Sequence, residues 1–252
     1  MAVYRANGIV LRRTNFGETD RILTLYTREH GRLSAIAKGS RRPVSRLAAA
    51  TELFNYGRYL LATGRNLDVV TQSETRESFP NIRNDIHRIA YSTYIVELVN
   101  GVVEDRDPNY ELFDTILSCL YLLEGGVDPE IVTRSFELQL MMISGYRPHL
   151  ESCARCGAPP PKEKIGFSPS VGGVVCENCG DLPEDTIPIH RQTLDMMAKL
   201  LTAEPAEIRD LRMSNGIRVE MANVMRWYIR YRLERELKSS EFIQALKSGA
   251  NK

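Results

Sequence analysis

The sequence predicts an α+β protein of more than one domain, with a small β-barrel first, α-helices after it and a cysteine-rich insertion among the helices. Short apolar runs separated by turn residues fill residues 1–80. From residue 82 onward, apolar residues recur at helical spacing. Two Cys-x-x-Cys pairs then interrupt the helical pattern in a stretch rich in Pro and Gly, at about residues 150–185.

Five strands are predicted in the first eighty residues, and their apolar residues lie in positions 3–11, 22–26, 33–37, 54–61 and 67–70. Five short strands over this length predict a small barrel. The five-stranded, partly open barrel is the OB-fold, whose common ligand is single-stranded nucleic acid. An SH3-like barrel fits the pattern nearly as well, so the pattern leaves the topology open. Tyr56 and Tyr59 are expected on opposite faces of the fourth strand, one of them in the core.

The predicted loop between the third and fourth strands is strongly basic. Residues 38–46 include no acid and four cations, which are Lys38, Arg41, Arg42 and Arg46. Gly39 and Pro43 favour a flexible loop over a helix face. Residues 1–50 hold ten Lys/Arg against three Asp/Glu, in a chain whose net charge is only +1. Clustered cations release counterions from a phosphate backbone, so the loop is a candidate nucleic-acid contact; a merely solvated loop is the alternative.

Helices are predicted over residues 82–102, 112–123 and 128–144 before the cysteine region, and from residue 191, over 215–238 and at the end of the chain after it. Asp105–Pro108 ends the first of these helices, Gly125-Gly126 the second and Gly145 the third. The acidic stretch 97–151, with eleven Asp/Glu against three arginines, falls in this part. The predicted domains are therefore a barrel over residues 1–80 and a helical domain over 81–252, with an insertion at about 150–185.

The predicted helix over residues 215–238 has an apolar face and a basic face. The apolar residues are Ile217, Met221, Val224, Met225, Tyr228 and Ile229, and the cations are Arg218, Arg226, Arg230, Arg232, Arg235 and Lys238. A helix packed on the core with a solvated basic side is the favoured interpretation. The alternative is a docking surface, in which a basic rim beside an apolar groove binds an acidic, apolar peptide tail.

The cysteine region has the spacing of a four-thiolate metal site. Cys153 and Cys156 form the first pair, Cys176 and Cys179 the second, and nineteen residues lie between the pairs. This spacing is typical of a structural Zn²⁺ site with no open coordination position. Disulfides are disfavoured in a reducing cytoplasm, and a redox pair would explain one Cys-x-x-Cys motif but not two. The fifth cysteine, Cys119, is expected to be a small buried apolar residue.

The sequence contains no phosphate-binding loop, no Gly-x-Ser-x-Gly elbow and no His-Glu-x-x-His pair, and its four histidines are scattered. We therefore expect no enzymatic activity. It has no apolar stretch of the roughly 20 residues that span a bilayer and no signal-peptide core at its N-terminus, so no membrane association and a cytoplasmic location are expected.

Several segments resemble one family of bacterial proteins. These are residues 18–28 (ETDRILTLYTR), 31–42 (GRLSAIAKGSRR), 78–83 (SFPNIR), 94–98 (YIVEL), 136–138 (FEL) and 145–148 (GYRP), together with the Cys153/Cys156 pair. In order and over essentially the whole chain, they are similar to the RecO recombination mediators of DNA repair. Part of that family carries the zinc quartet.

The resemblance implies an N-terminal OB-fold, a helical C-terminal domain and an embedded zinc finger. It implies binding of single- and double-stranded DNA, annealing of complementary strands, and partnership with RecR and with the acidic tail of single-strand-binding protein. Together these would help to load RecA at the nucleoid. Lys38, Arg41, Arg42 and Arg46 are then the leading DNA contacts. An RNA- or ribosome-associated zinc-ribbon protein is the alternative, and a metal-dependent nuclease a weaker one.

Overall fold

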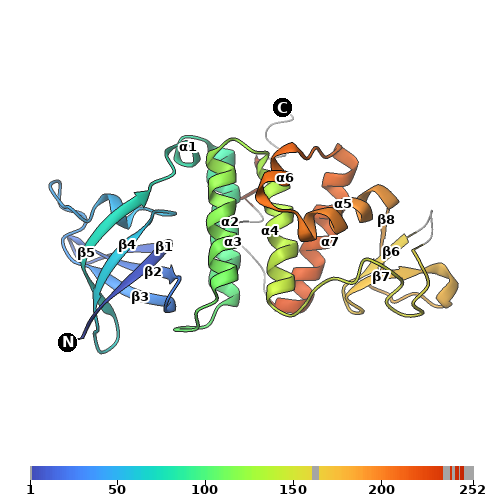
Figure 1. Ribbon diagram of the computed structural model, residues 1–252, viewed down its shortest axis with the longest axis horizontal. Helices are drawn as coiled ribbons and strands as arrows, with labels where there is room; N and C mark the ends of the chain where they lie inside the picture. The colour runs from blue at the N-terminus through green and yellow to red at the C-terminus, as the bar shows by residue number, and fades with distance from the viewer. Residues whose placement is uncertain (1, 161–164, 235–238, 240–241, 244, 247–252) are drawn as a thin grey trace. The chain divides into compact units, whose positions relative to one another are not determined.

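The computed structural model describes residues 2–160, 165–234, 239, 242–243 and 245–246. The chain forms two compact units (Figure 1). The first comprises Met1–Gly125 with Ser239–Lys252, and the second comprises Gly126–Lys238. None of the described helices is long and apolar enough to cross a bilayer.

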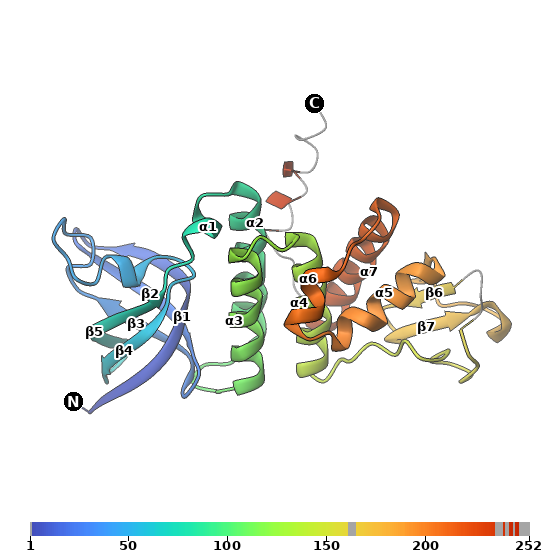
Figure 2. The ribbon, with the colours of Figure 1, turned by 45° about the horizontal axis from the view of Figure 1, so that its top comes forward.

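The first unit begins with a closed five-stranded barrel, as predicted (Figures 1 and 2). Its strands are β1 (Val3–Phe16), β2 (Asp20–Thr27), β3 (Gly31–Ala37), β4 (Tyr56–Ala62) and β5 (Asp68–Glu77). The order around the barrel is β1-β2-β3-β5-β4, with β3 and β5 parallel and the other pairs antiparallel. This is the OB-fold, which decides the topology that the strand pattern left open.

The barrel closes around small and aliphatic side chains contributed by every strand. Tyr59 is the largest of them and is fully buried. Its hydroxyl donates to the carbonyl of Ala50 (2.8 Å) and accepts from the amide of Asn55 (3.1 Å), so its polar atom is satisfied inside the barrel. The tight turn from β2 to β3 needs Gly31, because its φ is +63° and a Cβ there would lie 2.3 Å from the carbonyl oxygen of Asp107.

Three helices complete the first unit: α1 (Pro80–Arg83), α2 (Ile86–Val102) and α3 (Tyr110–Glu124). The predicted helix over residues 82–102 is interrupted because Asp85 caps α2, accepting hydrogen bonds from the amides of His87 and Arg88. Phe113 of α3 packs against the rings of Tyr26 and Tyr56 on the barrel wall. Residue 80 thus marks the end of the barrel, whereas the compact unit that contains the barrel continues through α3.

The second unit is built on α4 (Pro129–Ile143), α5 (Arg191–Thr202), α6 (Pro205–Asp210) and α7 (Asn215–Leu233). Both faces of α4 are covered, and even the charged pair Arg134–Glu137 is buried within it. The predicted apolar face of α7 is confirmed, with Met221, Val224 and Tyr228 all buried. The predicted end of this helix, with Arg235 and Lys238, and most of the predicted terminal helix lie outside the described residues.

The cysteine region forms a small sheet in the second unit. Its strands are β6 (Ile165–Ser168), β7 (Gly173–Cys176) and β8 (Ile187–Ile189), in the order β7-β6-β8. β6 and β7 form an antiparallel hairpin, and a short 3-10 turn, η2 (Glu177–Cys179), carries the second cysteine pair. The sequence did not indicate β8, because its central residue is Pro188 and a proline disfavours strand pairing except at an edge, which is where β8 lies.

Candidate nucleic-acid interface and metal centre

The basic loop joins β3 to β4 and contains one 3-10 turn, η1 (Ala49–Thr51). Its four cations, Lys38, Arg41, Arg42 and Arg46, are all exposed to solvent. None of the four forms an ion pair with a carboxylate in the described part of the chain. The loop lies at the end of the barrel away from α2 and α3 (Figure 2).

The base of the loop is fixed to the turn between β1 and β2. The carboxylate of Asp20 accepts hydrogen bonds from the amide of Gly39 (2.8 Å) and the hydroxyl of Thr19 (2.9 Å). The amide of Arg41 donates to the Thr19 carbonyl (2.9 Å). The Gly39 amide, the Thr19 hydroxyl and the nearby cations Lys38 and Arg42 lower the pKa of Asp20, which stays ionised at neutral pH.

The rest of the loop is a succession of turns. The amide of Arg42 donates to the carbonyl of Gly39 (3.1 Å), that of Ser45 to Arg42 (3.0 Å) and that of Ala48 to Ser45 (3.3 Å). Val44 at the tip is 95% exposed, whereas Leu47 at the far end of the loop packs against the barrel core. The loop therefore presents cations on a hydrogen-bonded backbone.

Four other arginines of the barrel are engaged in ion pairs, whereas Arg5 and Arg12 on β1 are exposed and pair with no carboxylate among the described residues. Arg13 and Arg21 both contact the carboxylate of Glu52. Arg28 pairs with Asp114 and Arg32 with Asp105, which join the barrel to the helical segment of the first unit. Part of the positive charge of residues 1–50 is therefore neutralised by ion pairs within the fold. The four cations of the loop are not, and they remain available to an external anion.

One aromatic residue beside the loop was missed by the sequence reasoning. Phe16, at the end of β1, is 51% exposed and pairs with Asp20, the residue that fixes the base of the loop. A bulge between Val10 and Arg12 shifts the alternation of β1, so strand periodicity could not show that Phe16 faces solvent. Of the tyrosines considered, Tyr59 is the core residue and Tyr56 packs against Phe113.

The four predicted metal-ligating cysteines are brought together. Their sulfur atoms all lie within 4.8 Å of one another. The Sγ–Sγ distances Cys153–Cys179, Cys156–Cys176 and Cys176–Cys179 are each 3.5 Å. These distances far exceed the roughly 2.05 Å of a disulfide. They are close to the separation of about 3.8 Å that a tetrahedron with metal–sulfur bonds of about 2.3 Å requires. The cluster could therefore hold one metal ion.

The electrostatics of the cluster fit a cation. Burial raises the pKa of Cys153, but backbone amides of Cys156, Arg155 and Cys176 outweigh it and bring the pKa to about 6. Hydrogen bonding with Cys156 and burial raise the pKa of Cys179 to about 12. The backbone thus stabilises the Cys153 thiolate, whereas the pKa values of Cys176 and Cys179 are raised. A bound divalent cation would allow all four to ionise.

The fifth cysteine and the two histidines that flank the cysteine region, His149 and His190, lie outside the metal centre. Burial raises the pKa of Cys119 to about 12, in agreement with its prediction as a small core residue. His149 is hydrogen-bonded to Ser152 (2.7 Å), and His190 contacts Glu220. Neither histidine belongs to the cysteine cluster found among the described residues.

The predicted basic face of α7 is divided. Arg218 donates to Asp128 (3.1 Å) and to Glu130 (3.3 Å) of α4, so it is part of the packed interior. Arg226 and Arg230, in contrast, are exposed. Only the second half of the helix presents cations to solvent.

The comparisons with known proteins agree with this architecture. Residues 1–79 match the family model described as "Recombination protein O N terminal", and residues 83–241 match "Recombination protein O C terminal". The chain is 39% identical to the DNA repair protein RecO of Symbiobacterium thermophilum, over 98% of this chain and 99% of that protein. It is 41% identical to the RecO of Pelotomaculum thermopropionicum, over 96% and 94% of the two chains. The chain therefore belongs to the RecO family of DNA repair proteins.

Proposed function

We propose that this protein is a non-catalytic recombination mediator that binds single- and double-stranded DNA and anneals complementary strands. The observation that carries the proposal is the set of four exposed cations, Lys38, Arg41, Arg42 and Arg46, on an OB-fold barrel. Membership of the RecO family supports it.

The chemistry of annealing accounts for this arrangement. Two strands must approach although both are polyanions, so the protein must neutralise phosphates without reading bases. Arginine suits this task because its planar guanidinium binds phosphate and also stacks on exposed bases. The exposed ring of Phe16 beside the loop offers one further stacking surface for a single strand.

The proposed partners follow from the family. With RecR, the protein would help to load RecA onto DNA covered by single-strand-binding protein, and it would contact the acidic tail of that protein through the helical domain, residues 81–252. This work belongs in the bacterial cytoplasm, at the nucleoid. The division of the chain into a barrel over residues 1–80 and this helical domain agrees with the two family matches and remains part of the proposal.

The metal proposed for the cysteine cluster is Zn²⁺. Four thiolates in tetrahedral spacing are the donor set that zinc prefers in structural sites, and no coordination position is left for a substrate. The proposed role is to hold the sheet of β6, β7 and β8 together, since few large apolar side chains cluster around the cysteines.

Annealing of two oligonucleotides precoated with single-strand-binding protein tests the proposal. Wild type should accelerate annealing, and Arg41→Ala/Arg42→Ala should lose most of the acceleration. The control is Arg65→Ala/Arg191→Ala, which removes the same charge from exposed positions outside the loop.

Two outcomes would contradict the proposal. Equal loss in the control would show that total charge, rather than the loop, drives annealing. Absence of annealing by wild type, with nucleic-acid binding intact, would favour the RNA-associated alternative. Breakdown of labelled DNA in the presence of magnesium would show a nuclease.

A further inference from the structure

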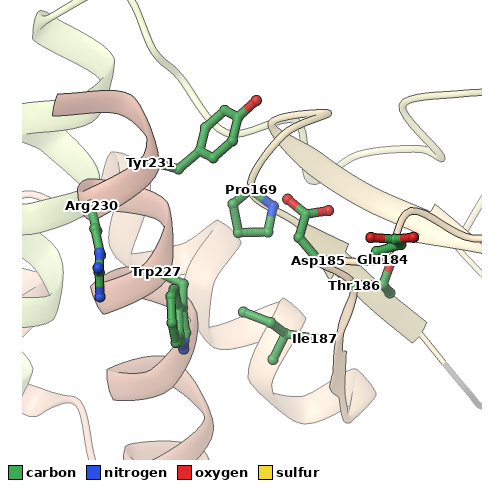
Figure 3. Close-up of a pocket in the computed structure, with 8 residues that line it drawn as sticks. All are labelled: Pro169, Glu184, Asp185, Thr186, Ile187, Trp227, Arg230 and Tyr231. Atoms are coloured by element: carbon green, nitrogen blue, oxygen red, sulfur yellow. The ribbon is translucent and has the colours of Figure 1, made fainter. Parts of the chain in front are cut away.

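The second unit contains a cleft between the zinc-ribbon sheet and the exposed side of α7 (Figure 3). Its volume is about 510 Å³. The lining residues are Pro169, Glu184, Asp185, Thr186, Ile187, Trp227, Arg230 and Tyr231. None of these lining residues belongs to the basic loop of the barrel, and the proposed function assigns no role to the cleft.

Two aromatic side chains are left uncovered at this cleft. Trp227 is 44% exposed and Tyr231 is 51% exposed. They lie four residues apart on α7 and therefore on one face, whereas Tyr228 between them is buried in the core. Exposed rings beside a concave surface are typical of a binding site rather than of a solvated helix face.

The same stretch of α7 is basic. Residues 223–233 contain three arginines and no acid. The guanidinium carbons of Arg226 and Arg230 lie 5.7 Å and 5.4 Å from the centre of the Trp227 ring. In Figure 3, Arg230 lies on one side of Trp227 and Ile187 on the other, so the indole stands between a cation and the cleft. Positive charge at the rim and an aromatic face inside the cleft are the two features of a single-strand stacking site.

The walls of the cleft are held in place without a ligand. Asp185 accepts from the hydroxyl of Ser168 (2.7 Å) and the amide of Ser170 (2.7 Å), which fixes the ribbon side. Arg232 donates to the carbonyl of Ser170 (3.1 Å) and lies over the ring of Tyr228, which ties α7 to the same turn. A preformed site of this kind loses little entropy when a ligand enters.

We propose that this cleft binds an unpaired base of a single-stranded nucleic acid, stacked on Trp227 and flanked by Tyr231, with the adjoining phosphates at Arg226 and Arg230. An uncharged base suits the interior better than an acidic peptide, because Glu184 and Asp185 line the opposite wall. The exposed Glu184 carboxylate can accept a hydrogen bond from an N–H group on the Watson–Crick edge of the base, such as N3–H of thymine. The proposal rests on the proposed function and adds to it a second contact, outside the barrel.

The chain offers a direct probe, because Trp227 is its single tryptophan. Titration of the full-length protein with a short oligo-dT should quench tryptophan emission with saturation, since stacking brings a base onto the indole. An abasic oligonucleotide of the same length should bind more weakly and quench much less. Emission therefore reports on this cleft even while the barrel loop also binds DNA.

Affinity for labelled oligo-dT, followed by anisotropy, provides a second readout. Trp227→Ala should weaken binding by about fivefold or more, as expected for the loss of one stacked base. Trp227→Phe should recover part of the loss. The matched control is Val219→Ala, which alters another exposed residue of α7 that does not line the cleft. Circular dichroism confirms that the variants remain folded.

The outcomes separate this proposal from the proposed function. Binding that depends on Arg41 and Arg42 but neither quenches Trp227 nor weakens in Trp227→Ala would overturn the cleft proposal alone. Absence of single-strand binding by wild type would overturn both. Quenching by an acidic, apolar peptide but not by oligo-dT would identify a protein tail as the occupant and overturn the nucleic-acid assignment.

Discussion

The arginines of this chain have different surroundings, which residue type alone does not distinguish. Arg41 and Arg42 are exposed on a hydrogen-bonded loop, and the Arg41 guanidinium donates one hydrogen bond to the carbonyl of Gly17 (3.2 Å). Arg134 and its partner Glu137 are buried in α4, with an N–O distance of 2.6 Å. The first two arginines are accessible to a polyanion, whereas the Arg134–Glu137 pair is shielded from one inside the fold.

The buried pair leads to a prediction about stability. Glu137→Ala should lower the free energy of unfolding by about 3–5 kcal/mol, because it removes the carboxylate that lies 2.6 Å from the buried Arg134 guanidinium. The control Asp195→Ala breaks the exposed pair Arg191–Asp195 and should cost under about 1 kcal/mol. Urea denaturation of both variants measures the difference. Equal, small effects would show that Arg134 reaches solvent.

Asp128 leads to a prediction about pH. Burial raises the pKa of this carboxyl, but its hydrogen bonds with Arg218 outweigh burial, so the folded-state pKa lies below the ordinary value. A depressed folded pKa stabilises the fold above the unfolded value of about 3.9, and that contribution disappears as the pH falls through the folded pKa.

The variant Asp128→Asn isolates this effect, since asparagine caps a helix as well as aspartate. Its urea midpoint should lie below that of wild type at pH 6, and the difference should shrink at about pH 3. A difference of the same size at both pH values would mean that shape, and not charge, matters at this position.

At the scale of elements, we expect the stability of the sheet of β6, β7 and β8 to depend on the four clustered cysteines. The first pair is joined to β7 by few backbone hydrogen bonds, such as that from the amide of Ala154 to the carbonyl of Val174 (2.8 Å), and the surrounding apolar cluster is small. Metal removal should therefore unfold the sheet of β6, β7 and β8 locally, while the barrel loop keeps its affinity for DNA.

A thiol titration measures this. The protein as purified should contain one zinc per chain and react slowly with a thiol reagent. After chelation, Cys153, Cys156, Cys176 and Cys179 should react, and Cys119 should react only after full unfolding, because it is buried and its pKa is about 12. Rapid reaction of four thiols before chelation would contradict a metal-bound cluster.

The elements that the sequence predicted are those with strong local signals. The five strands of the barrel and the helices α3 and α4 follow from periodicity and turn residues. The strand β8 was missed because Pro188 opposes the pattern, and α6 because six residues are too few to show a helical period. Arg218 was grouped with the basic face of its helix, since its partners Asp128 and Glu130 are about ninety residues away in the sequence.

The candidate sites were predictable to different degrees. The cysteine ligands were evident from spacing, because metal geometry restricts it. The loop cations were evident from charge, but Phe16 and the cleft at Trp227 depend on a strand bulge and on packing between the ribbon and α7. Neither feature has a local signature in the sequence.

At the scale of the whole molecule, we expect phosphate binding by the basic loop, residues 38–46, to be the principal DNA contact, with the sheet of β6, β7 and β8 and the helices in supporting roles. The loop gathers four exposed cations, whereas Arg13, Arg21, Arg28 and Arg32 are held in ion pairs. Arg5 and Arg12 of β1 are also exposed, but the loop holds the larger group, so we expect the loop to dominate the electrostatic part of binding. The affinity of such binding falls as the salt concentration rises, with a slope set by the number of phosphate contacts.

The most direct test is the affinity for a short single-stranded oligonucleotide over a range of salt concentrations. With about four phosphate contacts, log K should fall against log salt with a slope near −3 for wild type. Loss of two contacts in Arg41→Ala/Arg42→Ala should reduce the slope to about −1.5. A nearly flat plot for wild type, or the same slope for the variant, would contradict the loop as the principal contact.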